Sequence, residues 1–140
     1  MGAPRPATTQ PPIEEHDVRA SWELLRTHDY GRIAVTRLGQ PEIYPVNYLV
    51  MQGRVRFATA PGAKLLGVLL GGRVAFEVDG VEAGTAWSVL VKGTAEEVQL
   101  SPDRTFPPLV PATPWVPGPR SAIVDITPVE VTGRRFRRPA

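Results

Sequence analysis

The middle of this 140-residue chain carries charge of only one sign. Between Glu42 and Glu77 there is no carboxylate, and four basic residues fall inside that interval: Arg54, Arg56, Lys64 and Arg73. Unbalanced cationic side chains attract anions, so this interval is the best candidate for a ligand site. The anion that it favours is a phosphate.

The stretch Phe57–Leu65, which reads FATAPGAKL, is the candidate phosphate-binding turn. The backbone N–H groups after its Pro-Gly pair, the Thr59 hydroxyl and the Lys64 ammonium can converge on one phosphate, with Arg54 or Arg56 reaching in from the adjoining strand. In the first turn of a predicted helix, Lys64 opposes the helix dipole by about 0.3 to 1 kcal/mol unless an anion is bound there. An ordinary turn followed by a lysine that extends from a buried helix explains the same residues equally well.

A second candidate lies in the segment Tyr44-Pro45-Val46-Asn47. Its proline interrupts a good strand pattern and leaves backbone groups of the ladder without partners, and those groups could meet a flat heterocycle. A simple bulge at a sheet edge accounts for the proline as well.

The elements that must position these residues are mostly short strands. Asp17 is expected to cap a helix that runs to about Thr27 and is ended by Tyr30-Gly31, and a second, buried helix is expected over 63–70. Turns are expected at 38–41, Gln52-Gly53 and Asp79-Gly80. The six expected strands cover 32–36, 42–50, 54–59, 74–78, 85–98, and 121–126 with 129–131, the last interrupted by Pro128 at an edge or bulge.

These links are too short for parallel crossovers, so the pattern predicts a mainly β fold with a small antiparallel barrel. Val55 and Phe57 should point to one face of their strand and Arg54, Arg56 and Ala58 to the other. The centre of the strand over 85–98 is apolar on both faces, so one face can fill the barrel while the other forms a subunit interface.

Length, composition and charge limit the number of domains, the kinds of site and the partners that the chain can have. The length fits one domain over 13–140, after a proline-rich arm over 1–12 that we expect to be disordered. The chain has no cysteine and only two histidines, so no metal site is expected. It has no apolar run typical of a signal peptide or a membrane span, which favours a soluble, cytoplasmic protein without a membrane partner. The net charge is +2, and the basic end, Arg134–Arg138, is interpreted as solvated, with nucleic-acid binding as an alternative.

Several motifs, taken in order, resemble one known family: GRIAV at 31–35, PVNY at 45–48, VRFAT at 55–59 with GAK at 62–64, AFEV at 75–78, WSVLVKG at 87–93 and VTGRR at 131–135. They are similar to the pyridoxamine 5'-phosphate oxidase-like split barrels that bind FMN, in particular the short actinobacterial-type members. The resemblance spans roughly Val18 to Arg138. It implies a six-stranded antiparallel split barrel with two or three short helices, and a homodimer with a flavin site at each side of the interface.

The resemblance also implies a cofactor, FMN or alternatively the deazaflavin F420, and residues that hold it. Thr59, Lys64 and Arg56 would bind the phosphate, the backbone of 45–47 would lie along the ring, and Trp115 would reach the ring from the partner chain. The full set of cofactor-binding residues that it implies is Tyr44, Pro45, Val46, Asn47, Arg56, Phe57, Thr59, Lys64, Leu65 and Trp115.

A flavin carries the redox chemistry itself, which agrees with the lack of a recognisable catalytic triad or carboxylate pair. The function expected is that of a flavin-dependent oxidoreductase acting on an unidentified small molecule, with no catalytic residue assigned and no nucleic-acid partner. Two alternatives remain: an F420-dependent reductase of quinones, enones or nitro compounds, and a non-enzymatic flavin-binding protein for storage or sensing. Oxidation of vitamin B6 is not expected, because no residues that would clamp the phosphate of such a substrate can be located.

Overall fold

The computed structural model describes residues 13–59, 64–99 and 122–137. The predicted arm over 1–12 and the proline-rich segment after residue 100 lie outside these ranges. The elements, in chain order, are β1 (Ile13–His16), α1 (Val18–Arg26), β2 (Tyr30–Arg37), β3 (Gln40–Asn47), β4 (Leu49–Met51), β5 (Arg54–Thr59), α2 (Lys64–Leu69), β6 (Arg73–Glu82), β7 (Thr85–Glu97) and β8 (Ala122–Arg137).

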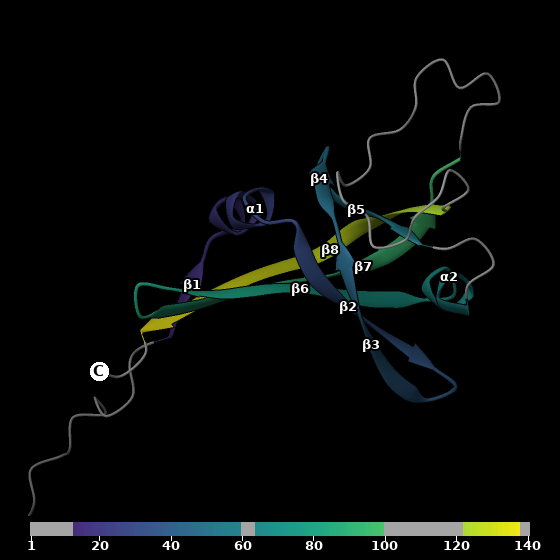
Figure 1. The fold of residues 1–140 in the computed structure, drawn as a ribbon, viewed down its shortest axis with the longest axis horizontal. Helices are drawn as coiled ribbons and strands as arrows, with labels where there is room; N and C mark the ends of the chain where they lie inside the picture. Colours follow the sequence, from purple (N-terminus) through teal and green to yellow (C-terminus); the bar gives the residue numbers. More distant parts are fainter. Residues whose placement is uncertain (1–12, 60–63, 100–121, 138–140) are drawn as a thin grey trace, which may run out of the picture.

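The strands form one curled antiparallel sheet in the order β3-β2-β6-β7-β8-β5-β4, and β1 pairs with β8 beside this path (Figure 1). The predicted mainly β split barrel is confirmed. The predicted count of six strands is wrong, because seven strands follow one another in the sheet and the segment 42–50 is not one strand.

The chain turns a corner at Tyr48, and this corner separates β3 from β4. Tyr48 is buried, its N–H donates to the Asp29 carbonyl (3.0 Å), and its hydroxyl donates to the Leu25 carbonyl (2.7 Å). β3 then pairs with β2, whereas β4 pairs with β5. Burial raises the pKa of Tyr48 well above its ordinary value, so the hydroxyl stays protonated and holds the corner.

Two of the three turns predicted from the sequence are present in the structure. Leu38-Gly39 and Gln52-Gly53 adopt positive φ angles, as two-residue hairpin turns require, and both turns are confirmed. The predicted turn at Asp79-Gly80 is wrong, because β6 continues to Glu82 and turns at Ala83-Gly84. Gly80 instead lies opposite Trp87, whose ring passes 2.9 Å from where a Cβ atom would stand, so the glycine allows this close approach.

Helix α1 begins as predicted at Asp17, whose Oδ1 accepts the Ala20 N–H at 2.7 Å. It ends at Arg26, and Thr27 forms the C-cap. The expected end at about Thr27 is confirmed, but the role of Tyr30-Gly31 as the signal that ends the helix is wrong, since both residues belong to β2. A Cβ atom at Gly31 would collide with the Phe76 ring, so this glycine is required for packing and not for ending the helix.

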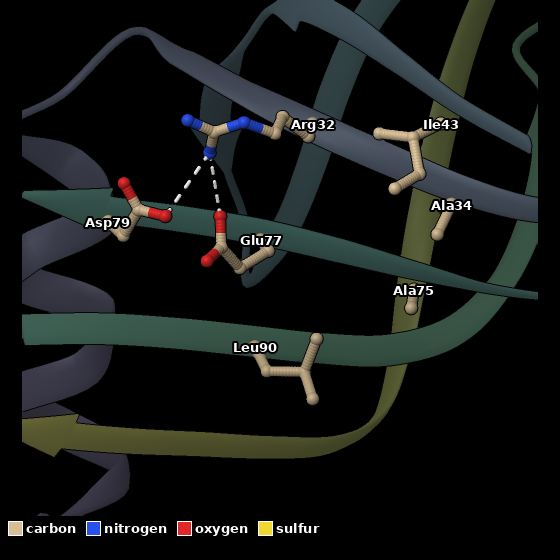
Figure 2. Close-up of a pocket in the computed structure, with 7 residues that line it drawn as sticks. All are labelled: Arg32, Ala34, Ile43, Ala75, Glu77, Asp79 and Leu90. Atoms are coloured by element: carbon tan, nitrogen blue, oxygen red, sulfur yellow. Dashed lines mark hydrogen bonds and ion pairs between the residues drawn. The ribbon is translucent and has the colours of Figure 1, made fainter.

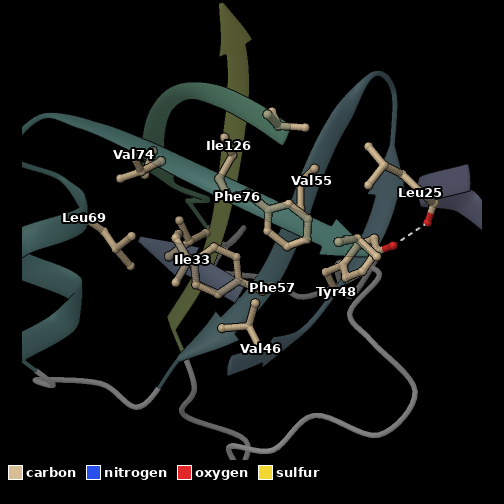
Figure 3. Close-up of a cluster of buried hydrophobic side chains, with 14 of the residues drawn as sticks. Leu25, Ile33, Val46, Tyr48, Val55, Phe57, Leu69, Val74, Phe76 and Ile126 are labelled. Atoms are coloured by element: carbon tan, nitrogen blue, oxygen red, sulfur yellow. Dashed lines mark hydrogen bonds between the residues drawn. The ribbon is translucent and has the colours of Figure 1, made fainter. Parts of the chain in front are cut away.

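The core fills the concave side of the sheet, and α1 and α2 lie apart from each other along it (Figures 1 and 3). Leu25 of α1 and Leu69 of α2 are both fully buried there, so the predicted burial of the second helix is confirmed for its last residue. Val55 and Phe57 point into this core and Arg56 away from it, as the alternation predicts.

Strand β8 differs most from its prediction. It runs without interruption through Pro128 to Arg137, and its register with β7 shifts next to Gly93, which confirms a bulge at the proline. A Cβ atom at Gly93 would collide with the Thr127 carbonyl. The basic residues 134–137 are therefore part of a strand, and Glu14 and Glu15 of β1 pair in register with Arg135 and Arg134. In the described residues, no helix has the length and apolar character needed to cross a membrane.

Candidate functional site

The convex side of β2, β3, β6 and β7, which we call the open face, carries a hollow of about 220 Å³ (Figure 2). Residues on these strands alternate between the core and this face, and none of the described elements packs over it. Two small side chains, Ala34 and Ala75, pair across β2 and β6 and form the floor. The other lining residues are Arg32, Ile43, Glu77, Asp79 and Leu90.

One end of the hollow is charged. Nη1 of Arg32 donates to Glu77 Oε1 at 2.8 Å and to Asp79 Oδ2 at 3.3 Å, as the dashed lines in Figure 2 show. The cluster therefore holds two carboxylates and one guanidinium. Partial burial and the neighbouring Asp79 together raise the pKa of Glu77 to about 7, although Arg32 acts in the opposite direction. Near neutral pH, Glu77 can consequently take up or release a proton.

The predicted residues of β3 fall on both sides of the sheet. Val46 is buried in the core, and Tyr44 packs against the core and donates its hydroxyl to Glu42 Oε2 at 3.0 Å, a bond that raises the pKa of Tyr44. Pro45 and Asn47 point the other way. The Asn47 side-chain nitrogen donates to the Asp29 carbonyl at 3.2 Å, whereas its Oδ1 is buried and has no hydrogen-bond partner among the described residues.

Strand β3 forms one edge of the described sheet, and its two prolines face outward from that edge. Arg37 and Gln40 flank a two-residue turn, so they form a hydrogen-bonded pair, and such pairs recur at every second residue. By this alternation Pro41 and Pro45 direct their backbone nitrogens to the free edge, where no ladder hydrogen bond is lost. The register runs unbroken through Pro45, so the proposed bulge is absent, and the carbonyls at this edge remain available to a ligand.

The predicted residues of β5 are also divided between two faces. Phe57 and Thr59 are buried on the core side, and Figure 3 shows Phe57 beside Val46. The Phe57 side chain is thus part of the core, and Thr59 is buried on the same side of the strand. Arg56 lies on the opposite side of β5, so its guanidinium and the Thr59 hydroxyl point away from each other.

Arg56 is engaged in a buried ion pair. Its Nε donates to Asp125 Oδ1 at 2.6 Å and its Nη2 to Asp125 Oδ2 at 2.9 Å, and only 8% of Arg56 and 5% of Asp125 are exposed. This hydrogen bonding raises the pKa of Arg56. The sequence did not indicate the pairing, because Asp125 lies far from Arg56 along the chain and meets it only through the β5–β8 ladder.

Three predicted residues are only partly described or not described at all. Lys64 opens α2, directly after the turn that was predicted to bind phosphate, but its side chain and that of Leu65 lie outside the described part of the molecule. Trp115 lies outside the described residues altogether. Their roles, like the cofactor-binding roles of the other seven residues, stay predictions.

The hollow itself was missed by the sequence reasoning. Its signal was present, because Arg32, Ala34, Ala75 and Glu77 occupy alternate positions of two expected strands, and small apolar residues on such a face leave space. Asp79 was assigned to a turn, and this error concealed the acidic pair.

The comparisons with known proteins identify the family. The sequence pattern of the pyridoxamine 5'-phosphate oxidase family matches residues 17–135, which is most of the chain. The chain belongs to this family. The match covers every strand from β2 to β7 and nearly all of β8, and it leaves out β1.

Three similar proteins illustrate the likeness, one of them by sequence alone and two by sequence and solved structure. An uncharacterized protein of Mycobacterium tuberculosis is 36% identical over 131 residues, which cover 89% of this chain and 86% of that protein. A Corynebacterium glutamicum protein named for the same oxidase is 35% identical, with a TM-score of 0.77 and coverage of 92% and 96%. A FAD-binding protein of Mycobacterium smegmatis is 29% identical, with a TM-score of 0.71 and coverage of 90% of this chain and 100% of that one.

Proposed function

We propose that this protein binds a flavin nucleotide and transfers electrons between the flavin and a small organic molecule. The observation that carries the proposal is the family match over residues 17–135, together with the 29% identical FAD-binding relative whose full length aligns with this chain. When bound, the flavin ring supplies the chemistry by accepting or donating a hydride, so the protein needs only to bind, orient and shield it.

The edge strand β3 offers groups suited to a flat ring with alternating hydrogen-bond donors and acceptors. Asn47 Oδ1 is an acceptor without a partner among the described residues, and the outward carbonyls of Pro41 and Pro45 are further acceptors. A buried polar atom that lacks a partner costs about 1 to 3 kcal/mol, and a ring N–H at this position would satisfy it. The hydroxyl of Tyr44 already donates to Glu42, so Tyr44 would serve by packing.

Phosphate binding would rest on side chains near the turn between β5 and α2. Helix α2 has six residues and contributes only a small dipole, so the ammonium of Lys64 is the main group expected to attract the anion. Arg56 is held by Asp125, and its part in this site is to fix the backbone of β5 that leads into the turn.

The proposed assembly is a homodimer with one flavin bound per chain. Support comes from the open face, which exposes apolar side chains beside charged ones: 67% of Ile43 is exposed, and Leu90 of β7 is only half-buried. A sheet face that exposes apolar side chains is typically covered by another layer. None of the described elements of the chain covers it.

Titration of the cofactor-free protein with FMN, FAD and F420 tests the proposal. We expect saturable binding of FMN or FAD, with a change in the visible spectrum of the ring, followed by reversible reduction of the bound flavin under anaerobic conditions. Tighter binding of F420 than of either flavin would favour the reductase alternative instead. Binding without turnover of quinones, enones or nitro compounds would favour storage or sensing.

A further inference from the structure

The hollow of the open face combines an apolar floor with a charged end. Ala34 and Ala75 form the floor, Ile43 flanks it from β3, and Leu90 lies on β7 beside Glu77 at the charged end (Figure 2). Its volume of about 220 Å³ lies below the roughly 300 to 1,000 Å³ of sites for drug-sized ligands. The hollow therefore suits a molecule of only a few non-hydrogen atoms.

The charged end is held in place by contacts within the chain. Arg32 donates from one nitrogen, Nη1, to both Glu77 and Asp79. Its guanidinium carbon also lies 5.9 Å from the centre of the Tyr30 ring, and a cation is attracted to an aromatic face at this distance. Arg32 thus has partners on two sides, and it keeps the two carboxylates close together at one end of the hollow.

This cluster has an excess of negative charge when it is fully ionised, because two carboxylates face one guanidinium. Arg32 contacts Oε1 of Glu77 and Oδ2 of Asp79, so each carboxylate has a second oxygen that can accept from a ligand. The Glu77 side chain is 34% exposed and that of Asp79 45%, so a molecule from solution can reach both.

The charged groups farther out on the open face do not cancel this excess. From β7, Leu90 pairs with Glu77 and carries no charge. Lys92 lies diagonally from Glu77, and it is paired in register with Glu130 of β8, which balances it. Arg134 of β8 is separated from the cluster by the width of β7. The open-face positions of β3 hold no titratable side chain.

An apolar floor next to an excess negative charge is complementary to a small amine in its ammonium form. A primary ammonium offers three N–H donors, and its hydrogen bonds to carboxylate oxygens are assisted by charge. A short carbon chain would remove the apolar floor from water. A carboxylate or phosphate ligand would instead add to the excess negative charge, and an alcohol would gain no attraction between charges.

We propose that the hollow binds a short alkyl ammonium ion, with its nitrogen between the carboxylates of Glu77 and Asp79 and its carbon chain over Ala34 and Ala75. The inference goes beyond the proposed function, because this site needs no flavin. The proposed homodimer would enclose the hollow, so ligand binding is measured on the protein in the assembly that it forms in solution.

Protons compete with such a ligand for the cluster. The pKa of Glu77 is about 7, and a bound ammonium favours the ionised carboxylate and lowers that pKa, so the complex holds fewer protons than the free protein. Binding should therefore strengthen as the pH rises through about 7, by at most about tenfold per pH unit for one proton released. A primary ammonium titrates near about pH 10.4 and stays charged over this range.

Nuclear magnetic resonance titration with n-butylammonium chloride at pH 5.5, 7 and 8.5 measures the affinity, on protein with and without added flavin. We expect saturable binding, with a dissociation constant in the millimolar range or below at pH 8.5 and at least about fivefold weaker binding at pH 5.5. n-Butanol and butanoate have a similar chain without the positive charge, and ammonium chloride has the charge without the chain. Each of the three should bind at least about tenfold more weakly than n-butylammonium.

Two matched pairs of variants test the residues. Glu77→Gln removes the excess charge, so it should weaken binding at least about tenfold and abolish the pH dependence. Glu82→Gln makes the same change of charge at an exposed position of the same strand and should preserve both. Ala75→Leu fills the floor and should weaken binding as strongly, whereas Ala86→Leu, on the open face of β7 outside the hollow, should not. Circular dichroism verifies that each variant folds.

The inference and the proposed function fail separately. Equal affinity of Glu77→Gln and the unaltered protein, or binding that weakens as the pH rises, would overturn the ammonium site. Flavin uptake without saturable binding of n-butylammonium would overturn this inference alone. Binding of n-butylammonium by a protein that takes up no flavin would overturn the proposed function alone.

Discussion

Arg56 and Asp125 face each other across β5 and β8 and form two parallel hydrogen bonds of 2.6 and 2.9 Å in a site that excludes most water. Removing one partner of such a buried pair leaves an uncompensated charge, which costs about 3 to 5 kcal/mol. We therefore expect Asp125→Ala to lower the free energy of unfolding by that amount in chemical denaturation.

The double variant Arg56→Met with Asp125→Leu leaves no unpaired charge, and it should recover most of the lost stability. Arg54→Ala, at an exposed position on the same face of β5, serves as the control and should change stability by less than about 0.5 kcal/mol. If Asp125→Ala is as stable as this control, the pair has no structural role, and Arg56 returns to the set of candidate phosphate ligands.

Lys64 is the residue whose replacement should affect flavin binding most selectively. A charge-assisted hydrogen bond contributes about 1.5 to 3 kcal/mol, so Lys64→Ala should weaken binding of a phosphate-bearing flavin about 10- to 100-fold. Binding of riboflavin, which has no phosphate, should change little. Equilibrium titration followed by flavin fluorescence measures both affinities.

Arg73→Ala is the matched control for Lys64→Ala, because Arg73 is an exposed basic residue of the same acid-free interval. Its affinity for FMN or FAD should stay within about twofold of the unaltered protein. An equal loss in both variants would mean that general positive charge, and not a specific contact of Lys64, attracts the cofactor.

Gly93 should tolerate no side chain. A Cβ atom there would collide with the Thr127 carbonyl beside the β7–β8 bulge, and backbone of this kind cannot move aside without loss of pairing. Gly93→Ala should cost more than about 2 kcal/mol in the free energy of unfolding. Gly67→Ala in α2, where a Cβ atom meets nothing within 4 Å, should be neutral or stabilising by up to about 1 kcal/mol.

The acidity of Glu77 predicts a pH dependence of folding stability. Its pKa is raised from 4.5 to about 7 in the folded chain, so the proton bound there stabilises the fold fully below about pH 4.5, and this stabilisation is lost as the pH rises through about 7. Between pH 5 and 8.5, dilute unaltered protein should lose up to about 1 kcal/mol relative to Glu77→Gln, a small value because water screens a side chain that is one-third exposed. Parallel curves for the two proteins would contradict the raised pKa.

The fold could be predicted from local patterns wherever a local cause determined it. The Asp17 cap, the turns at Gly39 and Gly53, and the alternation along β5 all depend on a few neighbouring residues. Gly31 and Gly80 misled the reasoning, because both were read as helix or turn signals. Both glycines make room for aromatic rings on a neighbouring strand, Phe76 for Gly31 and Trp87 for Gly80, and these contacts depend on the strand pairing.

The features of the candidate site that depend on local sequence could be predicted, and those that depend on strand pairing could not. The acid-free interval predicts a phosphate site at the turn before Lys64 from charge alone, and this stays a prediction because the turn lies outside the described residues. Asp125 as partner of Arg56, and Asp79 as neighbour of Glu77, depend on strand register and strand length. Register comes from the pairing of the whole sheet, so no single stretch of sequence reveals it.

The most direct test of the central claim is to purify the protein, release any bound chromophore by heat, and identify and count it per chain. Flavin binding predicts FMN or FAD, approaching one molecule per chain after incubation with an excess of the cofactor. A colourless protein that retains neither FMN nor FAD after that incubation would contradict it.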